Sequence, residues 1–147
     1  MTPMKRLYIG SDSGLTVLTG DGAIWLPYRE VLAGKFVRAM SAVRGVNQAY
    51  ACVTQDGLYG SRDGGESWQL VLPGNVHSVA VDPSDSNIVY AGTEPVGLYR
   101  SKDGGQHWTE LTALRDQPEN VTEKWWFPQF PHESHVLSIF VDWHDPR

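Results

Sequence analysis

Three histidines near the carboxyl end of the chain, with neighbouring carboxylates, are the residues whose types first suggest metal chemistry. They are His132, His135 and His144, with Glu133, Asp142 and Asp145 close by. The spacing of His132 and His135 differs from the His-Glu-x-x-His pattern of zinc helices, because the second histidine comes one residue early. If a strand begins at Val136, His135 lies at its start and His144 lies past its far end, so that one ion could not gather both. We therefore assign no metal site and expect no cofactor.

Two other kinds of side chain could act in nucleophilic or acid–base chemistry. The single cysteine, Cys52, lies in a strand-like run without an evident activating partner, which favours a core position over a nucleophile. Asp63 and Asp103 recur at equivalent places in a repeated motif, and residues that recur in turns serve the turn itself. The sequence therefore nominates no catalytic residue.

An internal repeat sets the elements that must position these residues. The sequence GLYGSRDGGESW at 57–68 returns 40 residues later as GLYRSKDGGQHW at 97–108, and a weaker copy lies upstream at 14–25. Short β-branched and aromatic runs, separated by Gly, Asp and Asn turns, predict an all-β chain. A period near 40 residues with about four short strands per unit is typical of a β-propeller blade.

The repeated motif resembles the Asp-box, or bacterial neuraminidase repeat, of sialidase-like β-propellers. Its Ser-x-Asp-x-Gly-x-x-Trp pattern occurs at Ser61, Asp63, Gly65 and Trp68 and again at Ser101, Asp103, Gly105 and Trp108. The resemblance covers nearly the whole chain and is strongest to uncharacterised bacterial glycosyl hydrolase-like repeat proteins. It implies a hairpin turn between the third and fourth strands of a blade, on the face opposite the ligand pocket. In that turn the Asp accepts backbone N–H bonds, the glycines permit positive φ, and the Trp covers the apolar side of the same hairpin.

The repeat divides residues 1–147 into one β-propeller module of four-stranded blades, with about three blades in the chain. With strands named a to d from the inside outward, strands b to d of a first blade occupy 5–30, complete blades occupy 34–72 and 75–112, and a terminal strand a occupies 136–142. An insertion at 113–135 separates the last complete blade from that strand.

The insertion and one inter-strand turn hold the candidate ligand-binding residues. Connections of this kind lie on the pocket face of a propeller, where aromatic side chains could stack on a sugar ring or hold a peptide segment. The alternative is that the same aromatic residues pack against the rim of the propeller. The candidates are Glu94, Trp125, Trp126, His132 and His135.

We interpret the chain as a binding or scaffolding module for a carbohydrate or protein ligand. Two alternatives stay open, a sialidase-like glycoside hydrolase (or a fragment of one) and a protein-assembly factor. The sialidase resemblance implies an arginine triad, a Tyr/Glu pair and an Asp acid/base, and none of these carries over residue by residue. Glycoside hydrolysis generally needs two carboxylates aimed at one bond, and the sequence nominates no such pair.

Charge and composition restrict the partners and the compartment. The chain has 12 Lys and Arg against 17 Asp and Glu, a net charge of −5 that argues against a nucleic-acid ligand. No apolar run reaches the roughly 18–20 residues of a membrane helix, and the amino terminus lacks the apolar core of a secretory signal. A single cysteine fits a reducing compartment. We therefore expect a cytoplasmic protein without a nucleic-acid or membrane partner.

The strand order bcd-abcd-abcd-a predicts self-association. Three blades cannot close a ring, because propellers typically have about 4–8 blades. Two chains related by a two-fold axis would make six blades, with each terminal strand a completing the first blade of the partner. The alternative is that the chain is the amino-terminal part of a longer propeller. We favour the homodimer.

Overall fold

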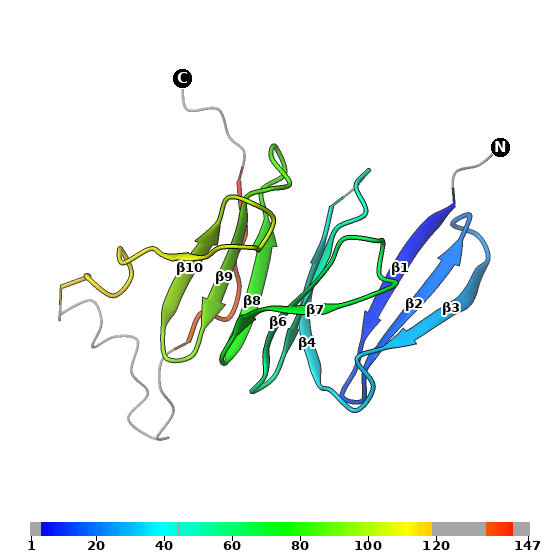
Figure 1. Ribbon diagram of the computed structural model, residues 1–147, viewed down its shortest axis with the longest axis horizontal. Helices are drawn as coiled ribbons and strands as arrows, with labels where there is room; N and C mark the ends of the chain where they lie inside the picture. Colours follow the sequence, from blue (N-terminus) through cyan, green and yellow to red (C-terminus); the bar gives the residue numbers. More distant parts are fainter. Residues whose placement is uncertain (1–3, 44, 119–134, 143–147) are drawn as a thin grey trace.

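The computed structural model describes residues 4–43, 45–118 and 135–142, and the regular elements within them are β-strands (Figure 1). The strands are β1 (Lys5–Gly10), β2 (Leu15–Gly20) and β3 (Trp25–Val31) in the first sheet, β4 (Val37–Ala42), β5 (Ala49–Val53), β6 (Gly57–Ser61) and β7 (Gln69–Pro73) in the second, and β8 (Val76–Val81), β9 (Val89–Thr93), β10 (Gly97–Ser101) and β11 (Thr109–Glu110) in the third. The prediction of an all-β chain is confirmed. The described ranges contain no helix long and apolar enough to cross a membrane.

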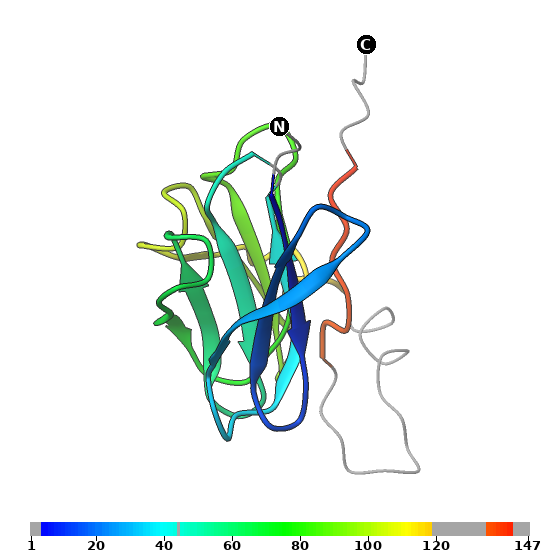
Figure 2. The same ribbon diagram turned by 90° about the vertical axis from the view of Figure 1, so that its right-hand side faces the viewer.

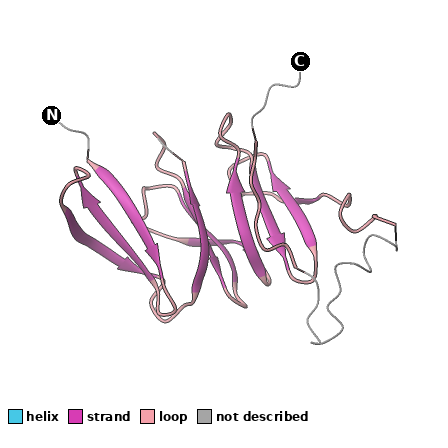
Figure 3. Cartoon of the chain, turned by 180° about the vertical axis from the view of Figure 1, so that it is seen from behind, coloured by secondary structure: helices cyan, strands magenta, loops and turns pink. Residues whose placement is uncertain are grey.

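Each sheet is a simple antiparallel meander in which strands pair with their neighbours in the sequence. The orders are β1-β2-β3, β4-β5-β6-β7 and β8-β9-β10-β11. The three sheets stand side by side like the ribs of a fan (Figures 1 and 3), and the first strands of the second and third sheets, β4 and β8, contact each other. We call the side of the fan that carries β4 and β8 its inner edge. The first sheet lacks a strand at the position that β4 and β8 hold in the other two, since β1 pairs only with β2 in the described chain.

The turns gather at two ends of the fan because consecutive strands run in opposite directions. One end, the Asp-box end, carries the turns 62–68 and 102–108, which contain the repeated motif. The other end, which we call the distal end, carries the turns 54–56 and 94–96 and the connection 74–75 between the second and third sheets. Figure 1 shows the Asp-box end at the top and the distal end at the bottom. Residues from different blades can therefore meet at either end.

Apolar side chains fill the spaces between neighbouring sheets, because alternate residues of a strand point to opposite faces. Between the first and second sheets the buried residues are Leu15, Val37, Ala51 and Val53. Between the second and third sheets they are Tyr50, Cys52, Leu58, Val76, Val79, Val89 and Ala91. Cys52 is fully buried, as predicted, and this burial raises the pKa of its thiol to about 12. The core of the chain thus lies between blades.

The free face of the first sheet contrasts with these packed interfaces. Leu7 and Ile9 of β1, which share this face, are 42% and 45% exposed. No strand of the described chain pairs with the second edge of β1. The first sheet therefore presents both an uncovered apolar face and an unpaired backbone edge.

Residues 135–142 lie along the inner edge beside β8, on the side of the molecule away from β7 (Figure 2). The sequence predicts a strand at 136–142, and in this chain the segment is paired with no described strand. The hydrogen bond of its residue Val136 is nevertheless equivalent to the one made by the first residue of β4. The Val136 N–H donates to Thr93 O at 3.2 Å, as the Val37 N–H donates to Ser11 O at 2.8 Å at the junction of the first and second sheets.

A glycine makes room for each of these contacts. A Cβ on Gly92 would lie 2.5 Å from Val136 Cβ, and a Cβ on Gly10 would lie 2.7 Å from Val37 Cγ1. Gly92 and Gly10 occupy equivalent positions in the repeat. Val136 thus docks on the third sheet as the first residue of a following inner strand would.

Candidate functional site

The carboxylates of the two Asp-box turns are occupied by the turns that contain them. Asp63 Oδ1 accepts the N–H groups of Glu66 at 3.0 Å and Ser67 at 2.9 Å, and the Ser61 hydroxyl at 2.8 Å. Hydrogen bonds from the Ser67 hydroxyl and N–H hold the pKa of the Asp63 carboxyl well below its usual range. These contacts give Asp63 the turn-stabilising role that the resemblance implies.

The second Asp-box repeats this arrangement. Asp103 Oδ1 accepts the N–H groups of Gln106 and His107, each at 2.9 Å, and the Ser101 hydroxyl at 2.8 Å. The backbone and side-chain hydrogen bonds from His107 hold the pKa of Asp103 far below its ordinary value. The glycines also behave as expected, since Gly105 has a φ of 89° and donates its N–H to Ser101 Oγ at 2.8 Å.

The tryptophans of the motif reach further than their own hairpins. Trp68 Nε1 donates to Gly65 O at 3.2 Å, which is a contact within the turn. Its ring also meets Tyr8 of the first sheet edge-on, with 6.3 Å between the ring centroids. Trp68 therefore packs at the interface between blades, a contact that the motif alone did not predict.

Side chains of the second sheet and of its Asp-box turn also donate hydrogen bonds to the Asp-box turn of the third sheet. The Tyr50 hydroxyl and Arg62 Nη2 both donate to Gly104 O, each at 3.0 Å. A groove of about 560 Å³ is lined by residues of both turns, among them Arg62 and Asp63 of the first and Gly104 of the second, together with Tyr50. The polar groups of the two turns already form hydrogen bonds with one another and with the neighbouring sheet. We therefore assign a structural role to the Asp-box end.

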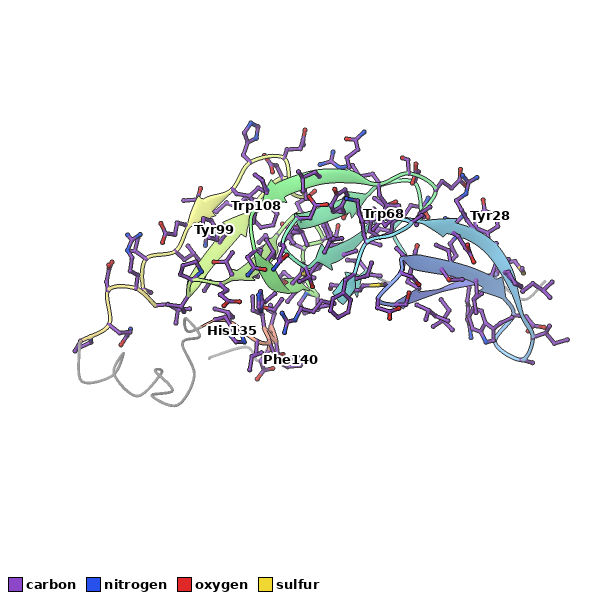
Figure 4. All side chains as sticks on the ribbon, turned by 90° about the horizontal axis from the view of Figure 1, so that it is seen from below. Tyr28, Trp68, Tyr99, Trp108, His135 and Phe140 are labelled. Carbon is purple, nitrogen blue, oxygen red and sulfur yellow. The ribbon has the colours of Figure 1, made fainter. Side chains whose placement is uncertain are left out.

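A different group of polar side chains meets at the distal end, and we call it the His77 cluster: His77 of β8, Glu94 of the β9–β10 turn, and His135. His77 Nε2 lies 2.9 Å from Glu94 Oε2, and the rings of His77 and His135 are 4.7 Å apart between centroids. One nitrogen of each imidazole and one oxygen of the carboxylate all lie within 4.8 Å of one another. Figure 4 looks onto this end and shows His135 at the inner edge, across the molecule from Trp68 and Trp108.

A β-bulge and a backbone contact bring these residues together. The pairing of β8 with β9 shifts register between Val76 and Ser78, so that His77 is the bulged residue. The Glu94 N–H donates to Asn75 O at 3.0 Å, and Asn75 Nδ2 donates to Glu94 Oε2 at 3.2 Å. The docking of Val136 then places His135 against the ring of His77.

The environment of His77 favours a neutral imidazole. The side chain is only 5% exposed, and its Nδ1 atom is buried without a hydrogen-bond partner among the described residues. Burial lowers the pKa of His77, Arg38 and His135 lower it further, and Glu94 opposes them. Arg38 Nη1 lies 3.4 Å from His77 Nε2 and comes from the equivalent bulge of β4.

The structure brings together two of the five candidate ligand-binding residues, Glu94 and His135. Trp125, Trp126 and His132 lie outside the described residues, as do His144, Glu133 and Asp145 of the metal argument. Sequence reasoning missed His77 and Arg38. The signal that could have found them is a large polar residue near the start of a mainly apolar run: His77 is second in VHSVAV, and Arg38 is third in FVRAM. Such a residue is compatible with a β-bulge.

Comparison with solved structures shows similarity to β-propeller proteins with Asp-box repeats. A structure of YCF48 bound to D1 peptide matches at 24% identity over 74% of this chain, with a TM-score of 0.55. An ancestral GH74 enzyme matches at 22% identity over 82% of the chain (TM-score 0.60), and the GH74 enzyme of Niastella koreensis at 16% over 71% (TM-score 0.56). No protein-family model and no curated protein matches the sequence.

These similarities extend over only part of each solved protein. The chain spans 38% of the YCF48 chain and 19% of each GH74 chain. At such low identity they show the fold, three antiparallel sheets that match a fragment of a β-propeller.

Proposed function

We propose that this chain is a β-propeller binding module that holds a polypeptide segment at its distal end. The observation that carries the proposal is the His77 cluster with the neighbouring Arg38, a group of polar side chains contributed by two different sheets and by the segment at 135–142. Among the described residues the Asp-box end offers no comparable group, because the carboxylates of Asp63 and Asp103 are bound by their own turns. A distal-end site also agrees with the pocket face that the Asp-box resemblance implies.

The charges at the distal end suit a peptide. Arg38 is exposed and can pair with an acidic side chain, while Asn75 and Glu94 can hydrogen-bond a peptide backbone. The YCF48 structure, whose fold this chain shares in part, is described as bound to a peptide, which supports a ligand of the same class. The aromatic residues predicted to stack on a sugar lie outside the described residues, so carbohydrate remains the second candidate.

A paired screen of the purified chain on a peptide array and a glycan array tests this proposal. Arg38→Gln and Glu94→Gln should each weaken peptide binding about tenfold, as expected for the loss of about 1.4 kcal/mol of a charge-assisted contact. The matched control is Lys102→Gln, which removes an exposed cation at the Asp-box end and should leave binding unchanged. Peptide binding that survives both distal variants, or binding to glycans alone, would contradict the proposal.

A glycoside hydrolase is the alternative that the likeness to GH74 enzymes favours. Such chemistry needs two carboxylates about 5–10 Å apart with a free path to the substrate. At the distal end Asp56 is held by Lys35 and Tyr59, so it is not free to act as the second carboxylate beside Glu94. Turnover of aryl glycosides that a single substitution of Asp56 or Glu94 abolishes would establish the enzymatic alternative.

A further inference from the structure

We propose that His77, Glu94 and His135 bind a divalent transition-metal ion of the zinc class at the distal end, through two imidazole nitrogens and one carboxylate oxygen. The proposal goes beyond the binding function above, and its test does not depend on which ligand the module holds. This set of ligands differs from His132, His135 and His144, for which the sequence predicts no shared ion.

The geometry of the cluster is close to that of a metal site. The ligand atoms lie within 4.8 Å of one another, and His77 Nε2 and Glu94 Oε2 are 2.9 Å apart. A tetrahedral zinc ion with bonds of about 2.0–2.2 Å requires ligand atoms roughly 3.3–3.5 Å apart. Small rotations of the three side chains therefore suffice. Two histidines and one glutamate are also a ligand set that zinc enzymes use with a fourth position left open.

Burial supplies an independent observation. His77 is 5% exposed, and its Nδ1 has no hydrogen-bond partner among the described residues. Glu94 faces the other ring nitrogen, Nε2, so an ion in the cluster binds Nε2. Burial of the ring holds this nitrogen in place for the ion.

Neighbouring residues act on the site in opposite directions. Asn75 Nδ2 donates to Glu94 Oε2 at 3.2 Å, an outer contact that orients the carboxylate as such contacts do in metal centres. Arg38 Nη1 lies 3.4 Å from His77 Nε2, and its positive charge opposes a cation there. Because Arg38 is exposed, its guanidinium can turn toward solvent when an ion enters. Arg38 thus lowers the affinity without blocking the site.

The donor atoms select the class of ion. Imidazole nitrogen suits Zn²⁺, Cu²⁺, Ni²⁺ and Fe²⁺, whereas Mg²⁺ and Ca²⁺ prefer sites built from oxygen alone. We expect Zn²⁺ and its spectroscopic substitute Co²⁺ to bind, and Mg²⁺ and Ca²⁺ not to bind.

The test is calorimetric titration of the full chain with ZnCl₂, together with the visible absorption of the Co²⁺ form. The expected result is one ion per chain, with cobalt d–d bands of a nitrogen- and oxygen-ligated site. Glu94→Gln and His135→Gln, at partly exposed residues that should not disturb the core, should each weaken zinc binding at least tenfold. Arg38→Gln should strengthen it.

The matched control is His107→Gln, which removes the exposed pair formed by His107 Nδ1 and Asp103 Oδ2 at 2.6 Å, another imidazole–carboxylate contact. This variant should bind zinc like the parent chain. The proposal is overturned if the parent chain takes up neither ion, if zinc binding survives both Glu94→Gln and His135→Gln, or if Arg38→Gln weakens it. Loss of zinc binding in His107→Gln alone would place the ion at the Asp-box end and would also overturn it.

Discussion

At the scale of single residues, the two ends of the fan differ in how their polar groups are satisfied. Asp63 and Asp103 accept hydrogen bonds from neighbouring residues of their own turns. His77, by contrast, is buried beside Glu94 and Arg38, and its Nδ1 atom has no hydrogen-bond partner in the part of the chain that the structure describes. A saturated group stabilises the fold, whereas a buried unsatisfied one calls for an explanation.

Asp63→Ala should destabilise the chain by about 1–3 kcal/mol, because it strands the N–H groups of Glu66 and Ser67. Urea unfolding followed by tryptophan fluorescence measures this cost. The control is Asp12→Ala, at an exposed aspartate in the β1–β2 turn, which should change little. If Asp63→Ala unfolds like the parent chain yet loses ligand binding, the structural role of the Asp-box is wrong.

The Asp-box carboxylates should also make the fold sensitive to acid. Their folded pKa values lie below the roughly 3.9 of an unfolded aspartate, so their stabilisation is present above that value and is lost as the pH falls toward the folded pKa. The urea midpoint of the parent chain should therefore drop steeply below about pH 4. The double variant Asp63→Asn with Asp103→Asn should start lower and show a flatter profile. Equal slopes in the two proteins would refute the linkage.

The Cys52 thiol should be inert in the folded chain. Its side chain is fully buried, and burial raises its pKa to about 12, so thiolate is scarce at any ordinary pH. A disulfide exchange reagent at about pH 8 should leave the native chain unmodified and react rapidly once denaturant is added. Fast labelling without denaturant would contradict the packing between the second and third sheets.

At the scale of elements, the position of residues 135–142 depends on a glycine rather than on strand pairing. Gly92 leaves space for Val136, and Ser78 Oγ donates to Val136 O at 2.8 Å. In the second sheet the equivalent position is held by Cys52, which packs against β8. The position held by Gly10, Cys52 and Gly92 in the three sheets thus contacts the segment that follows along the inner edge.

Gly92→Ala should loosen the segment at 135–142, because the added methyl would lie 2.5 Å from both Val136 Cβ and Ser78 Oγ. Amide hydrogen exchange of the peptide covering 135–142 should become faster, and such overpacking should cost about 1–3 kcal/mol. The control is Gly60→Ala in β6, where the added Cβ would lie no closer than 3.2 Å to its nearest neighbour, Val71 Cγ1, so that a small shift of that side chain suffices. Unchanged exchange in Gly92→Ala would show that the segment does not depend on this contact.

At the scale of the whole molecule, the fan has two incomplete edges. The first sheet exposes Leu7, Ile9 and Leu26 and has an unpaired edge at β1, and the segment at 135–142 carries Phe140, which is 88% exposed. In a two-fold dimer, the 135–142 segment of each copy would pair with β1 of the other copy. Each first sheet would then gain the fourth strand that it lacks. Self-association of this kind remains a prediction.

Light scattering of the purified chain should give a mass twice the 16.4 kDa of one copy. Phe140→Asp should shift the chain toward monomer, because it places a charge where an apolar face is to be covered. The control is Val46→Asp, at a residue that is 43% exposed and belongs to the β4–β5 turn rather than to either edge. A stable folded monomer in the parent chain would exclude the six-bladed dimer.

The sequence by itself determined the three antiparallel sheets and the Asp-box turns of this protein, although the strand that it predicted at 136–142 is not formed in this chain. These depend on local physics that repeats with the period of 40 residues: alternating apolar residues make strands, and Asp and Gly make the turns. The hydrogen bonds of Asp63 and Asp103 follow from residues at most four positions away, so the motif was enough to predict them.

Only the tertiary structure decided where His77 and Arg38 lie and which residues meet them. His77, Glu94 and His135 are distant in the sequence and converge through a bulge in β8, a turn after β9 and the docking of Val136 on Gly92. A bulge adds one residue to one strand and re-aims its side chain, which no periodic pattern records. The packing of Trp68 on Tyr8 was hidden for the same reason, since contacts between blades depend on how whole sheets stack and not on the repeat within each of them.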